Sequence, residues 1–365
     1  MLTREIATVS RITVCDGVSA EAEVIMQDGT RARAFAYAGI AGGLKEGDRV
    51  LVNTTACRKS LGTGGAHFVI ANLTEPEETA GDSRGHIVKC RYTPVQHTVM
   101  SVEEQDSPYH HLLESAACLE GTPVVCGQLH SQLPLLCCAL KELDPGCRIA
   151  YVMPDYSSLP IGFSRLVKNL KQGGALDWTV TCGQAFGGDY EAVNACSAMV
   201  FARDALGADY IAVLPGPGNA GTGTRLGFGS LDMASVLNGA SVMKGRCVCI
   251  PRICFADPRP RHRGLSHHTA TMLRDFVLMP VIVTLPLLDD PDKSQTLDRQ
   301  LEESGIGRRH RLVRSACRAG TDTAGRLGLR LSTMGHCFED TPEFFFASSA
   351  AAEAAIRLKR GEDPG

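Results

Sequence analysis

Residues 210–233 read YIAVLPGPGNAGTGTRLGFGSLDM, which is an apolar run, a glycine-rich peptide and the first turn of a helical pattern. The apolar run has the length of a buried strand, and the order strand, glycine turn, helix is the repeating unit of α/β proteins. The same order recurs through residues 85–365. We therefore predict a Rossmann-like three-layer α/β domain with a mostly parallel sheet over that range.

Apolar runs and helical periods place the individual elements of this domain. The predicted strands cover residues 123–127, 148–153, 178–182, 210–214, 246–250, 280–285, 311–314 and 329–332. The predicted helices cover residues 131–143, 159–172, 190–206, 231–244, 266–278 and 341–359.

The first 75 residues follow another pattern, in which apolar and polar residues alternate as in half-buried strands. Asp28 and Gly29 separate two such runs and predict a hairpin with a two-residue turn. The peptide Gly-Thr-Gly-Gly at residues 62–65 also joins two runs, so we interpret it as a hairpin loop and not as a phosphate loop. Alternating runs at residues 4–14, 19–27, 30–38, 48–54 and 67–73 predict a small SH3-like or OB-like β-barrel over residues 1–75, with polar residues 76–84 as a linker.

The overall composition is that of an ordinary globular protein, with 44% hydrophobic and 21% charged residues and a formal net charge of −3. A slightly acidic chain does not coat nucleic acid, so nucleic acid is an unlikely partner. The longest apolar run, residues 276–288, is too short to span a bilayer. No secretory signal opens the chain, and several of the 15 cysteines lie inside apolar runs without Cys-x-x-Cys spacing. We therefore expect a cytoplasmic protein without a membrane partner or a structural zinc site.

Polar peptides follow the predicted strands at their carboxyl ends, which is the edge where open parallel sheets bind ligands. His130 follows the first strand, Asp155 follows the second, and Asp189 directly precedes a predicted helix. Each has a structural alternative, because His130 and Asp189 would also cap helices and Asp155 would also form a turn. All three are candidate catalytic residues.

We call residues 215–229 the glycine loop. Its glycines allow successive backbone N–H groups to converge on one phosphate, and its threonines and arginine add side-chain donors. Gly-x-Gly-x-x-Gly spacing is present, but no helix begins at the third glycine, so a dinucleotide site is not indicated. The structural alternative is a long surface loop. The candidate ligand contacts are Gly216, Gly218, Gly221, Thr222, Gly223, Thr224 and Arg225.

Residues 257–268, the basic segment, read DPRPRHRGLSHH. Three guanidiniums and two prolines in one short peptide favour binding of an anion by Arg259, Arg261 and Arg263. A second interpretation is a metal site formed by Asp257, His262 and either His267 or His268. A third is a solvated basic loop. Asp257, His262 and His268 are accordingly kept as candidate catalytic residues.

Four motifs of the chain resemble an uncharacterised bacterial domain-of-unknown-function family, DUF3866. They are GPGNAGTGTRLG, FADPRPRHRGLSHH, QAFGGDYEAV and STMGH. The resemblance covers most of the chain and implies no activity, because the family is uncharacterised. The family pattern also implies an arginine after Thr-Met-Gly, where this chain has His336.

These observations predict a strand-end crevice that binds a phosphorylated or otherwise anionic small molecule. The glycine loop would hold a phosphate, Arg225 and the arginines of the basic segment would neutralise charge, and the aspartates and histidines would act as bases, metal ligands or polarising groups. Hydrolysis or group transfer at an anionic centre is the expected chemistry if the protein is an enzyme. The alternatives are a non-catalytic ligand sensor or assembly module and a metal-dependent hydrolase. No cofactor is indicated, and self-association stays open.

Overall fold

The computed structural model describes residues 2–62, 64–74 and 85–365. The chain forms two compact units, Met1–Val99 and Met100–Gly365. The linker predicted at residues 76–84 lies outside the described residues, as does Thr63 of the predicted loop at residues 62–65.

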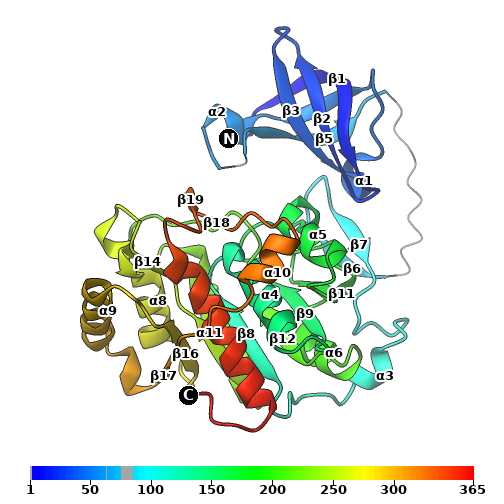
Figure 1. Cartoon of the computed structure of the whole chain (residues 1–365). Coiled ribbons are helices and arrows are strands. Elements are labelled where there is room, and N and C mark those ends of the chain that lie inside the picture. Colours follow the sequence, from blue (N-terminus) through cyan, green and yellow to red (C-terminus); the bar gives the residue numbers. More distant parts are fainter. Residues whose placement is uncertain (1, 63, 75–84) are drawn as a thin grey trace. The chain divides into compact units, whose positions relative to one another are not determined.

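In the described part of the first unit, five strands close into a barrel with the order β1-β2-β3-β5-β4 (Figure 1). β3 and β5 run parallel, whereas the other neighbours are antiparallel. Alternate residues such as Val9, Val24 and Val50 fill the interior, so the predicted period of two and the barrel are confirmed. The elements are β1 (Arg4–Cys15), β2 (Ser19–Met26), β3 (Arg31–Tyr37), α1 (Ala38–Ala41), β4 (Arg49–Asn53), α2 (Thr55–Arg58) and β5 (Ala66–Asn72), followed by the antiparallel pair β6 (Ile87–Lys89) and β7 (His97–Val99).

The hairpin between β2 and β3 is present, but its turn is longer than the predicted two residues. The Met26 N–H donates to the Thr30 carbonyl at 2.9 Å, and the Gly29 N–H donates to the Met26 carbonyl at 3.0 Å. Of the turn residues, only Gly29 has a positive φ, at 81°. The Asp28 carboxylate accepts the Thr30 N–H at 2.9 Å and stabilises this three-residue turn, which is a common alternative to the primed two-residue turn.

The second unit contains, among its described residues, an eight-stranded sheet with the order β11-β10-β9-β12-β8-β13-β16-β17. All neighbouring strands in it are parallel. The predicted parallel α/β organisation is therefore confirmed. The strands are β8 (Pro123–Gly127), β9 (Ile149–Met153), β10 (Trp178–Cys182), β11 (Tyr190–Ala192), β12 (Tyr210–Val213), β13 (Arg246–Ile250), β16 (Ile282–Pro286) and β17 (Arg311–Ser315).

Helices cover both faces of this sheet, so successive strand residues belong to different hydrophobic cores. Val124 of β8 packs into the core that contains α6, α7 and α9, whereas its neighbour Val125 packs into the core that contains α4, α5, α10 and α11. Figure 1 shows α4 and α11 over one face. The helices are α3 (His110–Leu113), α4 (Leu133–Leu143), α5 (Arg165–Gln172), α6 (Ala195–Asp204), α7 (Met233–Val242), α8 (His267–Thr271), α9 (Pro291–Ser304), α10 (Thr321–Arg326) and α11 (Pro342–Lys359).

Several elements differ from the sequence-based predictions; for example, α5 begins at Arg165 and not at residue 159. The helix expected from residue 190 begins at Ala195, because Asn194 caps it and residues 190–192 pair with β10 as the edge strand β11. The strand expected at residues 329–332 is not part of the main sheet; Ser332–Thr333 (β18) pairs only with His336–Cys337 (β19). The polar helix α9 was not predicted. Its N-cap Asp290 and the buried pair Leu297 and Leu301 are the signals for it.

Candidate functional site

The connections of the sheet reverse direction between the adjacent strands β8 and β13. The chain leaves β8 towards β9, and it leaves the adjacent β13 towards β16, on the opposite side. Such a reversal separates the connecting segments, and in open α/β sheets it is the usual place for a ligand. Gln128 directly follows β8, and Arg252 lies two residues after β13. These two residues therefore lie at the point of reversal.

The glycine loop and the basic segment, which are separate in sequence, meet at this edge. A methyl group placed on Gly223 would lie 3.4 Å from Nη2 of Arg261, and one on Gly221 would lie 3.3 Å from Cε1 of His268. In addition, the Phe228 and His268 rings stack with centroids 4.0 Å apart. The structure therefore brings the two candidate ligand-binding segments side by side.

The glycine loop folds on itself and does not form a phosphate loop that leads directly into an α-helix. The Thr222 N–H donates to the Gly227 carbonyl at 2.9 Å, and the Thr222 and Thr224 hydroxyls bond each other at 3.0 Å. The loop then enters a 3-10 turn at Gly229–Asp232 before α7 begins. Its two threonine side chains thus stabilise the loop locally, and Arg225 forms an ion pair with Asp275 at 2.8 Å.

Asp257 of the basic segment is buried and forms ion pairs with two guanidiniums. Its carboxylate lies 2.8 Å from Nη2 of Arg252 and 2.7 Å from Nη2 of Arg259, and Nε of Arg259 donates to it at 2.9 Å. The hydrogen bonds from Arg259, reinforced by the charge of Arg252, hold the pKa of Asp257 far below its usual range. Asp257 is therefore the internal counter-ion of Arg252 and Arg259.

His262, His267 and His268 form a compact cluster, which we call the histidine triplet. One ring nitrogen from each lies within 4.8 Å of those from the other two. The triplet forms because β14 (Ile253–Cys254) pairs with β15 (Gly264–Leu265) and folds the basic segment back on itself. His262 ends a 3-10 turn at Pro260–His262, and the other two open α8.

The environment of the histidine triplet favours neutral imidazoles. Burial lowers the pKa of His262 to about 3, and the charge of Arg252 acts in the same direction. Burial also lowers the pKa of His268 to about 3 and lowers that of His267, with the Arg252 and Arg261 charges adding to the effect in both. The three rings therefore keep nitrogen lone pairs at neutral pH.

His130 is held rigidly between two loops. Its Nδ1–H donates to the Pro215 carbonyl at 3.2 Å, so Nε2 accepts the Ser164 hydroxyl at 2.7 Å. Burial lowers its pKa to about 4, and the bond to Pro215 only partly opposes this shift. These contacts fix the orientation of the His130 ring between the Pro215 carbonyl and the Ser164 hydroxyl.

The two remaining candidate acids are engaged in backbone contacts. Asp155 accepts the Gln184 N–H at 2.7 Å and packs against Gly183, so it joins two strand-end loops. Asp189 accepts the Thr179 N–H at 2.8 Å and pairs with Lys171, and it does not cap α6 as the sequence had suggested. Neither Asp155 nor Asp189 belongs to the histidine triplet.

Two arginines of the basic segment have separate surroundings. Arg261 is exposed and has no hydrogen bond or ion pair within the part of the chain that the structure describes. Arg263 lines a different pocket of about 390 Å³, together with acidic residues that include Asp290, Asp292 and Asp340. Arg261 is thus the arginine of the segment that faces the glycine loop.

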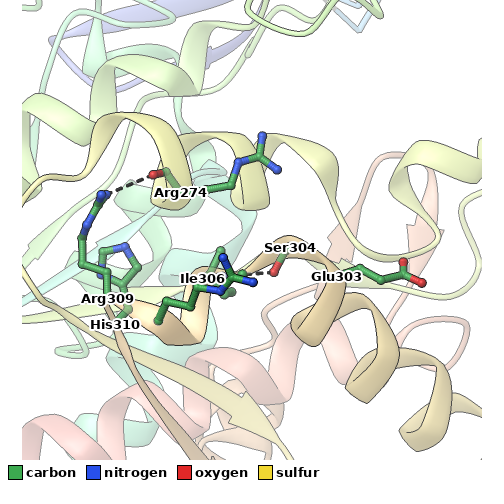
Figure 2. Close-up of a pocket in the computed structure, with 8 residues that line it drawn as sticks. Arg274, Glu303, Ser304, Ile306, Arg309 and His310 are labelled. Atoms are coloured by element: carbon green, nitrogen blue, oxygen red, sulfur yellow. Dashed lines mark hydrogen bonds between the residues drawn. The ribbon is translucent and has the colours of Figure 1, made fainter.

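A further pocket of about 370 Å³ lies between α9 and the π-helical turn at Met272–Phe276 (Figure 2). Two of its arginines have other partners, since Arg309 donates to the Arg274 and Val277 carbonyls and Arg274 pairs with Asp275. Every predicted site residue lies outside this pocket, so it is not the site that the sequence indicated.

Sequence reasoning missed Arg252 and Phe228 as members of the site. Arg252 is only 4% exposed and was hidden by its apolar neighbours, although a charged residue just after a buried strand was a usable signal. Phe228 carried no signal of its own, because a lone aromatic residue in a glycine-rich loop does not indicate what it stacks on.

The chain belongs to the family described as "Protein of unknown function (DUF3866)", which matches residues 33–352. The family inferred from the sequence motifs is thereby confirmed. No curated protein and no solved structure matches the chain. Within the described residues, no helix combines the length and the apolar character needed to cross a membrane.

Proposed function

We propose that the second unit binds an anionic small molecule, preferably a phosphorylated one, between the glycine loop and the basic segment. The observation that carries the proposal is the position of the Arg261 guanidinium beside Gly223, at the carboxyl edge of a parallel sheet. A guanidinium without a protein carboxylate is a donor for phosphate or carboxylate oxygens.

Charge and backbone donors support the same ligand class. Arg252 and Arg259 share one carboxylate, Asp257, so the addition of Arg261 leaves the group positively charged. The N–H groups of Gly221 and Gly223 donate no hydrogen bond to any described residue. Backbone N–H groups beside a cation form the usual lining of a small anion site.

The proposal is one of binding. Asp155, Asp189 and Asp257 are each held by hydrogen bonds or ion pairs, so a catalytic carboxylate has no support. A ligand sensor fits these contacts as well as a transferase or hydrolase does.

We also propose that the domains divide at residues 1–75 and 85–365. A Rossmann-like assignment for the second unit and a cytoplasmic location are further proposals of ours.

Isothermal titration of the full chain with inorganic phosphate, and then with sugar phosphates and nucleotides, tests the proposal. Loss of a charge-assisted hydrogen bond in Arg261→Ala is expected to weaken phosphate binding about 10-fold or more. Arg261→Lys should lose part of this affinity, since it keeps the charge without the bidentate geometry. Arg308→Ala, which alters the pocket of Figure 2, is the matched control and should leave binding unchanged. Equal affinity in Arg261→Ala and the unaltered protein would refute the proposal.

A further inference from the structure

We propose that His262, His267 and His268 form a binding site for a divalent late first-row transition metal, Zn²⁺ in the first instance, with a coordination position left open for water or an anion. The site differs from the metal site considered from the sequence, because Asp257 is committed to Arg252 and Arg259 and is replaced by a third histidine.

The geometry of the rings carries this inference. The ring centroids are separated by 5.0 Å between His262 and His267, 4.7 Å between His262 and His268, and 4.3 Å between His267 and His268. The ligand nitrogens lie within 4.8 Å of one another. Zinc–nitrogen bonds of about 2.1 Å in a tetrahedral site place ligand nitrogens about 3.4 Å apart. Small rotations of the imidazoles would therefore bring the three nitrogens to the distances at which they bind one ion.

The hydrogen-bonding state of the rings is a second and independent observation. Nε2 of His267 and Nε2 of His268 are buried and have no hydrogen-bond partner among the described residues. Buried polar atoms are almost always satisfied, so two unpaired nitrogens in one cluster need an explanation. A metal ion satisfies both atoms at once.

The surrounding residues hold the rings as metal ligands are usually held. Nδ1 of His262 bonds the Ser266 hydroxyl at 2.8 Å, which leaves its Nε2 as the nitrogen for a metal. The same hydroxyl accepts the His268 N–H at 3.2 Å and so fixes the start of α8. Phe228 stacks on the His268 ring with an interplanar angle of 8°. Contacts of this kind orient ligands in known metal sites.

The donor set decides the class of metal. Three neutral imidazoles without a thiolate or a carboxylate suit Zn²⁺, Cu²⁺ or Ni²⁺ better than Mg²⁺ or Ca²⁺, which prefer oxygen. Three protein ligands also leave a position open, as catalytic zinc sites do. His268 borders Gly221, and Arg261 borders Gly223, so an anion held by the glycine loop would reach that position. This last step rests on the proposed anion site, whereas metal binding itself does not.

Zinc binding is tested first on the full chain, produced without a histidine tag and stripped with a chelator, in buffer free of phosphate. We expect one tightly bound Zn²⁺ per chain by elemental analysis and calorimetry. We also expect Co²⁺ to give the visible absorption of a tetrahedral site. A stoichiometry well below one, or the absence of that absorption, would overturn the inference.

Single variants locate the site. His262→Gln, His267→Gln and His268→Gln should each weaken Zn²⁺ binding by more than about 100-fold, because loss of an outer-shell partner alone costs about 10- to 100-fold. His111→Gln removes an exposed histidine beside His110 and controls for surface binding, so it should change nothing. His267 is only half-buried, which makes it the variant most tolerant of folding. Retention of the Co²⁺ spectrum by folded His267→Gln would also refute the site.

The order of the titrations separates this inference from the proposed function. Zinc binding without phosphate binding would uphold the metal site and refute the anion site. Phosphate binding to the metal-free protein, with no uptake of Zn²⁺ or Co²⁺, would do the reverse.

Discussion

Phe228 and His268 stack face to face, with ring centroids 4.0 Å apart and an angle of 8° between the planes. Phe228 lies near the end of the glycine loop, and His268 lies in the first turn of α8. This single aromatic contact therefore joins the two segments that form the candidate site. Phe228 is 5% exposed, so the contact is shielded from water.

Replacement of Phe228 by leucine should weaken the contact between the glycine loop and the start of α8. Aromatic stacking contributes about 0.5–1.5 kcal/mol beyond the burial of apolar area, so the free energy of unfolding in urea should fall by about 1 kcal/mol. Zn²⁺ affinity should fall too, since the His268 ring loses its support. Phe276→Leu changes a residue that is 37% exposed and should have little effect on either quantity. An unaltered urea midpoint in Phe228→Leu would show that the stack contributes nothing.

Replacement of Asp257 by asparagine should be among the most destabilising polar changes in the chain. The Asp257 and Arg252 side chains are only 3% and 5% exposed, and removal of one partner from a buried ion pair costs about 3–5 kcal/mol. Urea unfolding at neutral pH measures the loss. Asp275→Asn disrupts two more exposed ion pairs, with Arg274 and Arg225, for each of which about 0–1 kcal/mol is expected. Losses of equal size in the two variants would contradict this account.

Stability should also depend on pH through His130. Its pKa lies at about 4 in the folded protein and near 6.5 when unfolded, so the unfolded chain binds more protons between these values. The contribution of His130 is complete above about pH 6.5 and is lost as pH falls, by at most about 1.4 kcal/mol per pH unit. Urea unfolding at several pH values should give a shallower slope for His130→Gln than for the unaltered protein. His111→Gln, at an exposed position, should leave the slope as it is.

Gly223→Ala should disturb the glycine loop without unfolding the protein. Gly223 has a φ of 80°, where an L-residue is disfavoured by about 1–2 kcal/mol, and the added methyl would touch Arg261. Phosphate affinity should fall and the thermal midpoint should drop slightly. Gly325→Ala is the opposite control, because Gly325 lies within α10 with free space around it and alanine favours a helix there. A rise in phosphate affinity in Gly223→Ala would be inconsistent with the proposed site.

Periodicity in the sequence was sufficient for the barrel and for the parallel sheet, because buried strands such as β8, β9 and β13 are continuous apolar runs. Periodicity did not predict elements in which few residues are apolar or in which the pattern fits both a helix and a strand. In α9 only a few positions, Leu297 and Leu301 among them, face the core, so the helix looks like a polar loop. At β11, the short pairing with β10 outweighs the helical pattern that begins at Tyr190.

The sequence was sufficient to predict the location of the candidate site, but not which charged side chains pair with each other inside it. The order of strands and loops placed the glycine loop and the basic segment at one edge. Which carboxylate neutralises which arginine depends on the fold of the basic segment, and that fold is set by the pairing of β14 with β15. The sequence, which predicted Asp257 as a base or a metal ligand, did not show that this pairing places Arg252 beside it as an ion-pair partner.

The carboxylate of Asp257 also bears on which ligands the crevice would prefer. Together with Arg252, Arg259 and Arg261 it makes a set of three positive charges and one negative charge, so a doubly charged anion would bring these four side chains to neutrality. A phosphate monoester acquires its second charge near pH 6. The preference for such a ligand over chloride or a simple carboxylate should therefore grow as the pH rises through that value, with selectivity set by the ionisation of the ligand and not by that of the protein.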